Sequence, residues 1–484
     1  MRINEHFLKT AAELEPELIR TTHTLKPQSG SMGKGDVLLL DFGTHLVGHV
    51  TLRLGYEGAH PDAPAWIRLR FAERECELRE DPQAYTGWIS SGWIQWEQLH
   101  VDVLPAELSL PRRYAFRYLQ LEVLDTSSRF RLTVEEATCV ATTSADVTKC
   151  PPYRADPRLE ALDAAACLTL RECMQEVFED GPKRDRRLWL GDLRLQALAN
   201  YETYRNYDLV KRCLYLFAGT TLDDGAVGGC LFTQPRVEVD QMRMFDYALL
   251  FIPTLLDYHE ATGDMDTLRE LAPTAFRQVA LANRCFDEGD LALDTEALGW
   301  CFVDWKEGLN KQASAQGIYL YCLKAAVKIA ELLGEDDLRA DFLDHYARKQ
   351  AAAERLWDEE KGFYISGDEG QISWASQVWL TLGGAAHGSS QLLLKLPQSD
   401  AVGMVTPYMY HNYVDALLSA GARDEALGWL TRYWGGMLDQ GADTFWELYD
   451  PEDPDTSPYG GTIVNSWCHA WSCAPAYFLR RHFS

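Results

Sequence analysis

The chain of 484 residues is 46% hydrophobic and contains 15 tryptophans, a composition that excludes a disordered protein and can build a sizeable core. Its 46 basic and 72 acidic residues give a formal charge of −26, which argues against nucleic acid or an anionic membrane surface as a partner. A neutral or cationic ligand fits this charge better. The length allows about three average domains, or fewer if one large barrel takes up most of the chain.

The sequence contains no segment that predicts export or a membrane span. The N-terminus lacks the apolar core of a secretory signal, and no run approaches the roughly 20 apolar residues that cross a bilayer. The 12 cysteines are scattered and form no C-x-x-C pair, so we expect reduced and mostly packed thiols. These features predict a cytoplasmic protein, and they are compatible with a homodimer.

Residues 1 to about 150 show the pattern of β-strands. Short apolar or alternating runs are separated by Gly, Pro and Asp, as in an antiparallel β-sandwich. The runs are Val37–Gly43, His49–Gly55, Trp66–Ala72, Tyr118–Leu124 and Phe130–Val134. Cys150-Pro151-Pro152 then interrupts the pattern, so we expect an N-terminal β-sandwich domain over residues 1–150.

Residues 151–484 change to helical periodicity and keep it. Several of the segments end at Gly-Asp or Gly-Glu, as helices commonly do. Ten or more helices in hairpin succession predict an (α/α)₆ barrel, a toroid of six hairpins. A superhelical array is the alternative, which the lack of a fixed-period repeat disfavours. The segments are Arg158–Val177, Leu193–Phe217, Phe245–Ala261, Met265–Cys285, Ala313–Leu333, Asp336–Trp357, Trp374–Leu382, Tyr408–Ala420, Ala422–Met437 and Ser466–Arg481.

The longer stretches between the helices combine carboxylates with aromatic residues. Asp304 adjoins Trp305, and Trp446 adjoins Glu447. Loops from separate hairpins meet at one end of a barrel, so we expect these groups to converge on one cleft. Aromatic faces that stack on sugar rings and carboxylates that accept from hydroxyls are typical of carbohydrate recognition. The competing interpretation places the tryptophans in the core and the acids at helix caps. These stretches are Asp180–Asp192, Asp223–Asp240, Gly299–Lys311 and Gly441–Thr462.

The stretch Asp180–Asp192 concentrates three carboxylates, four basic side chains and a tryptophan. Gly181-Pro182 prevents a regular helix there, because proline removes a donor and restricts the residue before it. The charges therefore fall on a loop, where binding and catalytic residues tend to collect. Most charge runs are solvated surface loops, but Trp189 has no role in a purely solvated one.

Two carboxyls on opposite sides of a sugar are sufficient for glycoside hydrolysis. One protonates the leaving oxygen, and the other activates water or attacks the sugar. The sequence contains no Gly-rich phosphate loop, no G-x-S-x-G elbow and no H-E-x-x-H motif. The histidines form no close pair at ligand spacing near the acids, so we expect neither a metal nor another cofactor.

Several motifs together resemble the bacterial α-L-rhamnosidases of glycoside hydrolase family seventy-eight. Asp180–Asp192 resembles that family's Asp-Cys-Pro, basic-acidic cluster and Gly-Trp-Thr-Gly-Asp, and Phe302–Trp305 resembles its Phe-x-Asp-Trp. Thr444–Tyr449 resembles its Thr-x-Trp-Glu, and Ser466–Trp471 its late Ser-x-x-His segment. The runs Leu40–Gly43, Leu69–Glu73 and Phe116–Glu122 resemble its β-sandwich. The resemblance spans nearly the whole chain in the same order.

This resemblance implies an inverting mechanism with Asp185 as general acid and Glu447 as general base. It implies that Asp180 and Asp192 hold sugar hydroxyls, that Trp189 and Trp305 stack on the sugar, and that His469 contacts it. The predicted substrate-binding set also includes Arg184, Asp304 and Trp446, from the loops that combine charged and aromatic residues. Other interpretations exist for three of them: Asp185 in an ion pair with its arginine neighbours, Glu447 capping a helix, and His469 in the core.

Two departures from the family pattern matter. The family's acid is usually glutamate, so Asp185 is one methylene shorter, and the chain ends at Ser484 without the family's C-terminal β-domain. The hypothesis is an exo-glycosidase that removes terminal α-L-rhamnose, or a related deoxyhexose, from small glycosides. One alternative is a different (α/α)₆ glycosidase acting on a uronic-acid-containing disaccharide, which the arginines near Asp185 suggest. Another is a catalytically silent sugar-binding protein, which the shortened acid suggests.

Overall fold

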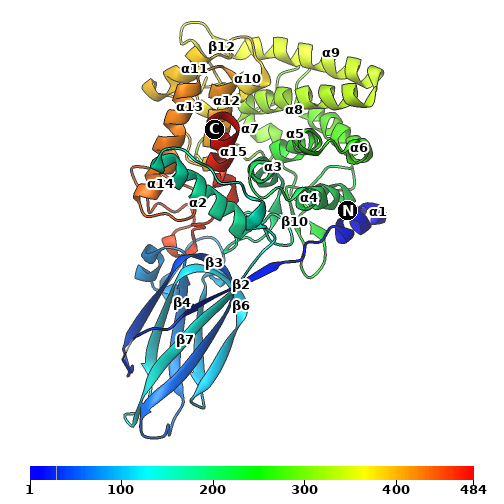
Figure 1. Ribbon diagram of the computed structural model, residues 1–484. Helices are drawn as coiled ribbons and strands as arrows, with labels where there is room; N and C mark the ends of the chain where they lie inside the picture. The colour runs from blue at the N-terminus through cyan, green and yellow to red at the C-terminus, as the bar shows by residue number, and fades with distance from the viewer. Residues whose placement is uncertain (29) are drawn as a thin grey trace.

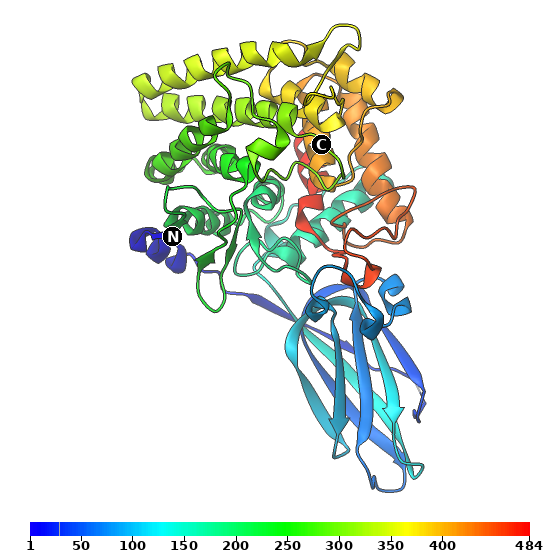
Figure 2. The same ribbon diagram turned by 180° about the vertical axis from the view of Figure 1, so that it is seen from behind.

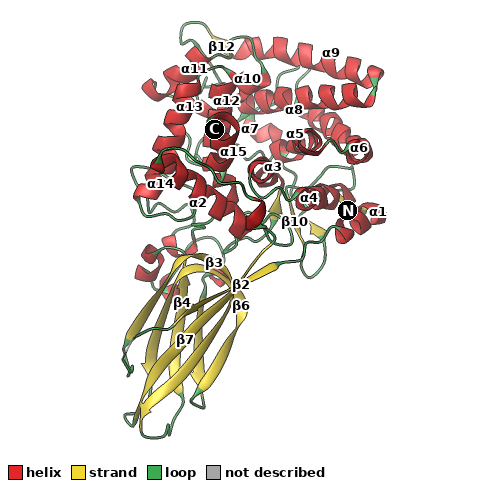
Figure 3. Cartoon of the chain, viewed as in Figure 1, coloured by secondary structure: helices red, strands yellow, loops and turns green. Residues whose placement is uncertain are grey.

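The computed structural model describes residues 1–28 and 30–484 and consists of a β-sheet domain joined to a larger helical domain. Figure 3 shows the separation clearly, with nearly all long strands in one part and the helices in the other. Among the described residues, no helix combines the length and apolarity that crossing a bilayer requires.

The β-sheet domain is built on one antiparallel sheet of six strands in the order β2-β7-β3-β6-β4-β5. Buried aliphatic residues of β3, β4, β6 and β7, among them Leu52, Leu69, Leu121 and Leu132, belong to a single hydrophobic cluster. Alternation along the strands directs these side chains to one face and polar ones to the other. The strands are β2 (Ile19–Leu25), β3 (Val37–Gly58), β4 (Ala65–Ala72), β5 (Trp96–Val101), β6 (Ala106–Asp125) and β7 (Phe130–Thr143).

The two runs predicted as separate strands, Val37–Gly43 and His49–Gly55, are one strand of 22 residues. Its register against β6 shifts between Asp41 and Leu46 and again between His49 and Thr51. Such bulges bend a strand without ending it. The interruption at Gly43 is therefore a bulge within β3 rather than a turn.

The helical domain is a closed ring of hairpins. Six inner helices contact their neighbours in succession, the fifth reaching the sixth through the rings of His411 and Phe478. The ring closes because the sixth helix, α15 (Ala474–His482), packs against the first, α3 (Leu190–Glu202). Nearly every residue of α3 is buried, whereas α9 (Asp336–Ala353), an outer helix, is mostly exposed. The closed ring confirms the predicted (α/α)₆ barrel and excludes the superhelical array. The inner helices are α3 (Leu190–Glu202), α5 (Phe245–Thr262), α8 (Gln312–Leu333), α10 (Trp374–Gly383), α12 (Pro407–Ser419) and α15 (Ala474–His482).

The outer layer contains both long amphipathic helices and short ones. It comprises α2 (Pro157–Cys173), α4 (Tyr207–Gly219), α6 (Met265–Ala282), α9 (Asp336–Ala353), α11 (Ser390–Lys395), α13 (Arg423–Trp429) and α14 (Gly435–Asp439). A further short helix, α7 (Thr295–Leu298), lies in the connection before α8. The short strand β8 (Leu188–Trp189) leads directly into α3 and pairs with β10 (Cys230–Phe232).

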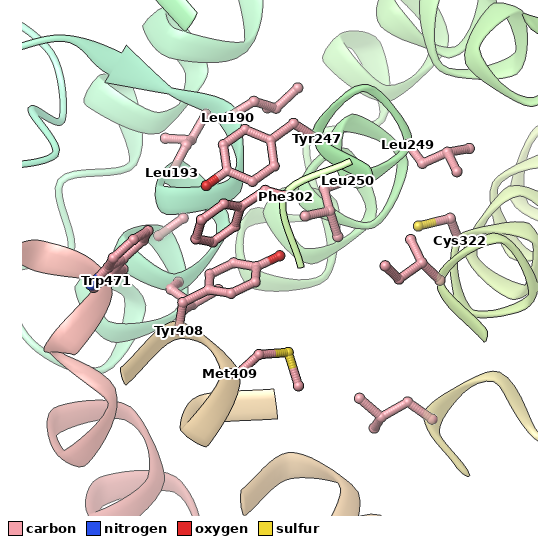
Figure 4. Close-up of a cluster of buried hydrophobic side chains, with 14 of the residues drawn as sticks. Leu190, Leu193, Tyr247, Leu249, Leu250, Phe302, Cys322, Tyr408, Met409 and Trp471 are labelled. Carbon is pink, nitrogen blue, oxygen red and sulfur yellow. The ribbon is translucent and has the colours of Figure 1, made fainter. Parts of the chain in front are cut away.

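The centre of the ring is filled by side chains from several inner helices. Figure 4 shows Leu193 of α3, Leu250 of α5 and Tyr408 of α12 converging with Phe302 and Trp471, which lie in connecting segments. Phe302 and Trp471 are stacked, with ring centroids 5.6 Å apart. The barrel interior is therefore a packed core, and any ligand must enter at its rim.

Two helical predictions need correction, and one helix was missed. The segment Leu193–Phe217 is two helices, because Thr203 leaves the helical region and Asn206 caps α4 by accepting from the Leu209 amide. The last helix begins at Ala474 rather than Ser466, and the eight residues before it lead into the barrel rim. The helix α11 at Ser390–Lys395 was not predicted.

The first residues of the chain lie with the helical domain rather than with the sheet. Strand β1 (Arg2–Ile3) pairs with β9 (Thr220–Thr221), and helix α1 (Glu5–Glu13) packs against α4. Figure 2 shows this helix beside the barrel, with the chain then crossing to the β-sheet domain. The chain thus passes between the two domains twice, once before the strands of the sheet and once after them.

Candidate active site

A cavity of about 220 Å³ opens at the rim of the barrel, where loops lead into the N-terminal ends of inner helices α3, α5, α8 and α15. Its volume is below the ~300–1,000 Å³ of typical drug-sized pockets, which suits a ligand as small as one sugar ring. Eight predicted site residues line it: Asp180, Arg184, Asp185, Trp189, Asp192, Trp305, Glu447 and His469. The predicted convergence of separate loops is therefore observed.

The segment from Asp180 to Asp192 is held by backbone contacts on both sides. The Asp180 carbonyl accepts from the Ala470 amide at 2.9 Å, and Asp180 Oδ1 accepts from the Arg187 amide at 3.0 Å. Asp192 then lies in the first turn of α3. Gly191 permits a close approach there, because a Cβ at this position would lie 2.4 Å from the ring of Tyr247.

Glu447 is buried and held from two directions. One carboxylate oxygen forms an ion pair with the guanidinium of Arg184, and the other accepts a hydrogen bond from the Tyr459 hydroxyl at 2.5 Å. Arg184 also lies over the Tyr459 ring, 4.1 Å from its centroid. Burial raises the pKa of Glu447, while the charge of Arg184 and the Tyr459 hydrogen bond act in the opposite direction. A buried, oriented carboxylate of raised pKa is suited to accept a proton from water.

Asp185 occupies the more open side of the same guanidinium. Its carboxylate lies 3.7 Å from Arg184 and 3.9 Å from Arg187, and its side chain is 22% exposed, against 8% for Glu447. Arg184 therefore lies between the two carboxyls proposed as acid and base. The alternative interpretation of Asp185 was an ion pair with its arginine neighbours. That ion pair is loose, because both separations exceed hydrogen-bond distance.

Asp180, Asp192 and His469 form a buried polar group next to these carboxyls. His469 Nε2 lies 3.9 Å from Asp180 and its Nδ1 lies 3.7 Å from Asp192. Burial, followed by the charges of neighbouring carboxylates, raises the pKa of Asp180 and of Asp192 well above the usual range. Burial and the charge of Arg184 lower the pKa of His469 well below 6.5, so its imidazole is neutral at pH 7.

Several buried polar atoms of the cavity lack a partner within the described part of the chain. They are Asp192 Oδ1, His469 Nδ1 and Trp305 Nε1. Buried polar groups are normally satisfied, and an exception calls for an explanation such as a ligand or water. Acceptors and donors at these positions can bind the hydroxyl groups of a bound ring.

Aromatic residues form the remaining walls, and several of them were not predicted. Trp189 and Trp305, which were expected, are joined by Tyr247, Trp300, Phe302 and Trp471. Tyr247 contacts Trp189 edge-to-face and donates to Asp192 at 3.4 Å. Tyr247 lies within a helical pattern, and its spacing there does not distinguish it from a core residue, so it could not be predicted as a site residue.

The β-sheet domain contributes a wall that the sequence did not reveal. Trp88 and Ile89, from the segment between β4 and β5, line the cavity. The Trp88 indole donates to the Pro458 carbonyl at 2.7 Å, and the Tyr85 hydroxyl donates to the Tyr459 carbonyl at 2.8 Å. Both bonds join this segment to the loop that holds Tyr459, the partner of Glu447.

The same segment anchors the loops that carry Asp185 and Glu447 through buried polar contacts. Glu77 forms a buried ion pair with Lys183, the neighbour of Arg184. Lys183 also donates to the Asn465 carbonyl at 2.9 Å, and Glu73 accepts from the Trp467 amide at 2.7 Å. The β-sheet domain is thus part of the site rather than an appendage.

Two predicted substrate-binding residues do not line the cavity. Trp446 is buried against Trp467 beneath the guanidinium of Arg74, and it faces a separate cavity of about 520 Å³ between the domains. Asp304 is buried and accepts from the amides of Val405, Thr406 and Trp305 at 2.8–3.1 Å. Asp304 therefore fixes loop backbone, and Trp446 supports the loop that carries Glu447.

Replacing Tyr459 by phenylalanine is expected to move the acidic limb of the kcat/KM profile to higher pH. The Tyr459 hydrogen bond lowers the pKa of Glu447, so its loss raises that pKa further. A base works only when deprotonated, so activity falls as pH drops through its pKa and would now fall from a higher pH. Tyr346→Phe, which removes a hydroxyl that donates to the Gly383 carbonyl and does not line the cavity, is the control. An unmoved limb would mean that Glu447 is not the titrating base.

A ring of six helical hairpins whose rim gathers carboxylates and aromatic rings beside a β-sheet domain defines a six-hairpin glycosidase. The family model described as the glycosyl hydrolase family 78 alpha-rhamnosidase N-terminal domain matches residues 12–141. The model described as the bacterial alpha-L-rhamnosidase 6 hairpin glycosidase domain matches residues 154–483. The chain therefore belongs to this α-L-rhamnosidase family of glycoside hydrolases, which confirms the resemblance found in the sequence.

Solved structures agree with this assignment. A rhamnosidase from Klebsiella oxytoca with rhamnose bound is 45% identical and superposes with a TM-score of 0.96, over 100% of this chain and 99% of that one. A family 78 rhamnosidase of Bacillus sp. GL1 is 23% identical with a TM-score of 0.76, over 96% of this chain and 47% of that one. At 23% identity, the similarity to the Bacillus enzyme shows that the two proteins share a fold.

Curated relatives match over longer proteins. An α-L-rhamnosidase of Streptomyces avermitilis is 23% identical over 474 residues, which are 90% of this chain and 41% of the relative. An N,N'-diacetylchitobiose phosphorylase of Vibrio proteolyticus is 25% identical over 228 residues, 41% of this chain and 27% of the relative. The chain thus spans less than half the length of these two relatives.

Proposed function

We propose that the protein hydrolyses terminal α-L-rhamnosides, with inversion at the anomeric carbon, and releases rhamnose from small glycosides. Asp185 donates a proton to the glycosidic oxygen as the bond from that oxygen to the anomeric carbon breaks. Glu447 removes a proton from the water that attacks the anomeric carbon from the opposite face. The cytoplasmic location predicted from the sequence belongs to this proposal, because small imported glycosides would reach the enzyme there.

The observation that carries the proposal is the placement of Asp185 and Glu447 on either side of Arg184 in one cavity. The half-buried position of Asp185, more open than that of Glu447, suits an acid that must meet a leaving group pointing outward. The buried position of Glu447 suits a base that holds a single water. Support for rhamnose as the sugar comes from the likeness over the full chain to the rhamnose-bound Klebsiella oxytoca enzyme.

The alternative of a uronic-acid-containing substrate receives less support from the site. That idea required free guanidinium groups to bind the sugar carboxylate. Arg184 is paired with Glu447, Arg186 donates to the Arg113 carbonyl at 2.9 Å, and Arg187 lies between Asp185 and the ring of Phe232. A charged sugar would have to displace these contacts.

The test is a panel of p-nitrophenyl glycosides that differ only in the sugar, with the anomer of the product followed by NMR. We expect release of nitrophenol from the α-L-rhamnoside and initial formation of β-L-rhamnose. Initial formation of α-L-rhamnose would contradict inversion, and a higher rate on a uronide would favour the alternative substrate. Tight rhamnose binding without turnover on any glycoside would identify a silent sugar-binding protein.

A further inference from the structure

A second cavity, of about 230 Å³, adjoins the active-site cavity and shares Met244 and Trp300 with it. It lies between α5, α6 and the loop around α7. Its walls are mainly apolar and include Val227, Ala248, Leu281 and Leu298. Neither the family motifs nor the catalytic carboxyls account for this space.

The two long polar side chains that line this cavity already form hydrogen bonds or an ion pair within the protein. Gln278 accepts from the Val227 amide at 3.2 Å and donates to the carbonyls of Gly225 and Thr274 at 3.1 and 2.9 Å. Arg243 is paired with Asp224 at 2.5 Å. A sugar placed here would lose hydration of its hydroxyls without gaining partners, which disfavours a carbohydrate occupant. An apolar occupant pays no such penalty.

Trp300 connects the two cavities. The residue is 51% exposed, although large aromatic residues are usually well buried. The Trp300 carbonyl accepts from the Phe245 amide at 2.8 Å, which ties the loop to the start of α5, directly after Met244. The ring can therefore contact a molecule that extends from the carboxylate cavity into the apolar one.

We propose that the apolar cavity binds the leaving group of the substrate and selects glycosides whose aglycone is apolar and aromatic. This inference rests on the proposed function, which places the sugar among the carboxyls and therefore the aglycone outside them. The apolar cavity adjoins the carboxylate cavity through Met244 and Trp300, and it offers apolar surface rather than free hydrogen-bonding groups. Flat aromatic aglycones gain most from contact with Trp300 and the thioether of Met244.

Filling the cavity tests the proposal. Ala248→Phe places a ring inside it, and Ala340→Phe, on the exposed surface of α9, is the matched control. Three substrates share the sugar: 4-methylumbelliferyl α-L-rhamnoside, a rhamnosyl-glucose disaccharide and α-L-rhamnosyl fluoride, which has almost no leaving-group volume. We expect Ala248→Phe to lower kcat/KM on the umbelliferyl glycoside by about tenfold or more, with the fluoride unchanged. Equal losses on all three substrates would overturn the proposal.

Binding of free 4-methylumbelliferone separates this inference from the proposed function. If no rhamnoside is turned over but the wild type binds the aglycone and Ala248→Phe does not, the proposed function fails and the apolar site stands. Turnover with equal aglycone binding by both proteins means that the apolar site fails. If the preference for the umbelliferyl glycoside over the fluoride is lost in Trp88→Ala and kept in Ala248→Phe, the aglycone lies against the β-sheet domain instead. Leu281→Asn, which makes the cavity polar without filling it, replaces Ala248→Phe if that variant does not fold.

Discussion

Replacing Glu447 by glutamine is expected to lower kcat on p-nitrophenyl α-L-rhamnoside by about 10²–10⁴-fold, the usual worth of a positioned general base. Glutamine keeps the shape of the side chain and can still accept from Tyr459, but it cannot take a proton from water. The loss should therefore appear in kcat, while the affinity for rhamnose, measured by calorimetry, changes little. The measurement is steady-state hydrolysis over the pH range in which the wild type is active.

Chemical rescue distinguishes a missing base from a damaged fold. In Glu447→Ala, azide can occupy the vacated space and attack the anomeric carbon in place of activated water. We expect added azide to restore part of the rate and to yield a rhamnosyl azide of inverted configuration. A glutamine variant that retains the full rate would remove Glu447 from the mechanism, and a variant with an altered CD spectrum would show only a structural role.

Replacing Asp185 by asparagine is expected to produce a loss that depends on the leaving group. A poor leaving group needs a proton as the bond breaks, so a methyl or disaccharide rhamnoside should lose about 10²–10⁴-fold in kcat/KM. A dinitrophenyl rhamnoside leaves as a stable anion and should lose far less. The measurement is a plot of log(kcat/KM) against the pKa of the leaving group, which we expect to be steeper for the variant than for the wild type.

The conservative variant Asp185→Glu serves as the control for that experiment. It keeps a carboxyl and restores the length usual in the family, so it should retain far more activity than the asparagine variant. An equal loss across all leaving groups would show that Asp185 binds the sugar instead of protonating the aglycone. Wild-type activity of Asp185→Asn on the poor leaving groups would mean that another group is the acid.

The part of the site that the sequence revealed is the part carried by contiguous motifs. Asp180, Asp185 and Asp192 lie within one short run, and that run stays together because its backbone bonds to Ala470 and to itself. When two residues adjoin in the sequence, it is harder to predict which of them faces the cavity. Trp446 and Glu447 both looked functional, yet one ring is buried behind the loop and only the carboxylate enters the cavity.

The residues that were missed reach the site through tertiary contacts. Trp88 and Ile89 come from the β-sheet domain, and their position depends on hydrogen bonds to a loop more than 360 residues later, such as that from Trp88 to Pro458. Tyr459 adjoins Gly460-Gly461, a pair that indicates a turn rather than a partner for Glu447. Local pattern cannot report contacts of this sequence separation.

The errors in the helical domain have a similar cause. Apolar periodicity continues from Leu193 to Phe217, because Tyr204 and Tyr207 keep the pattern through the break. The break itself depends on backbone angles at Thr203 and Arg205, the latter at a positive φ of 55°. The ring of hairpins could be predicted from helix number and order, whereas its closure through α15 and α3 is a property of packing.

Helix α1 has a partner, α4, that is synthesised about 200 residues after it. At roughly 5–20 residues per second, the ribosome takes about 10–40 s to produce that partner. The apolar face of α1 therefore stays uncovered while the whole β-sheet domain emerges and folds. Docking of α1 and β1 onto the barrel is then a late event in assembly, and the order of folding is not the order of the chain.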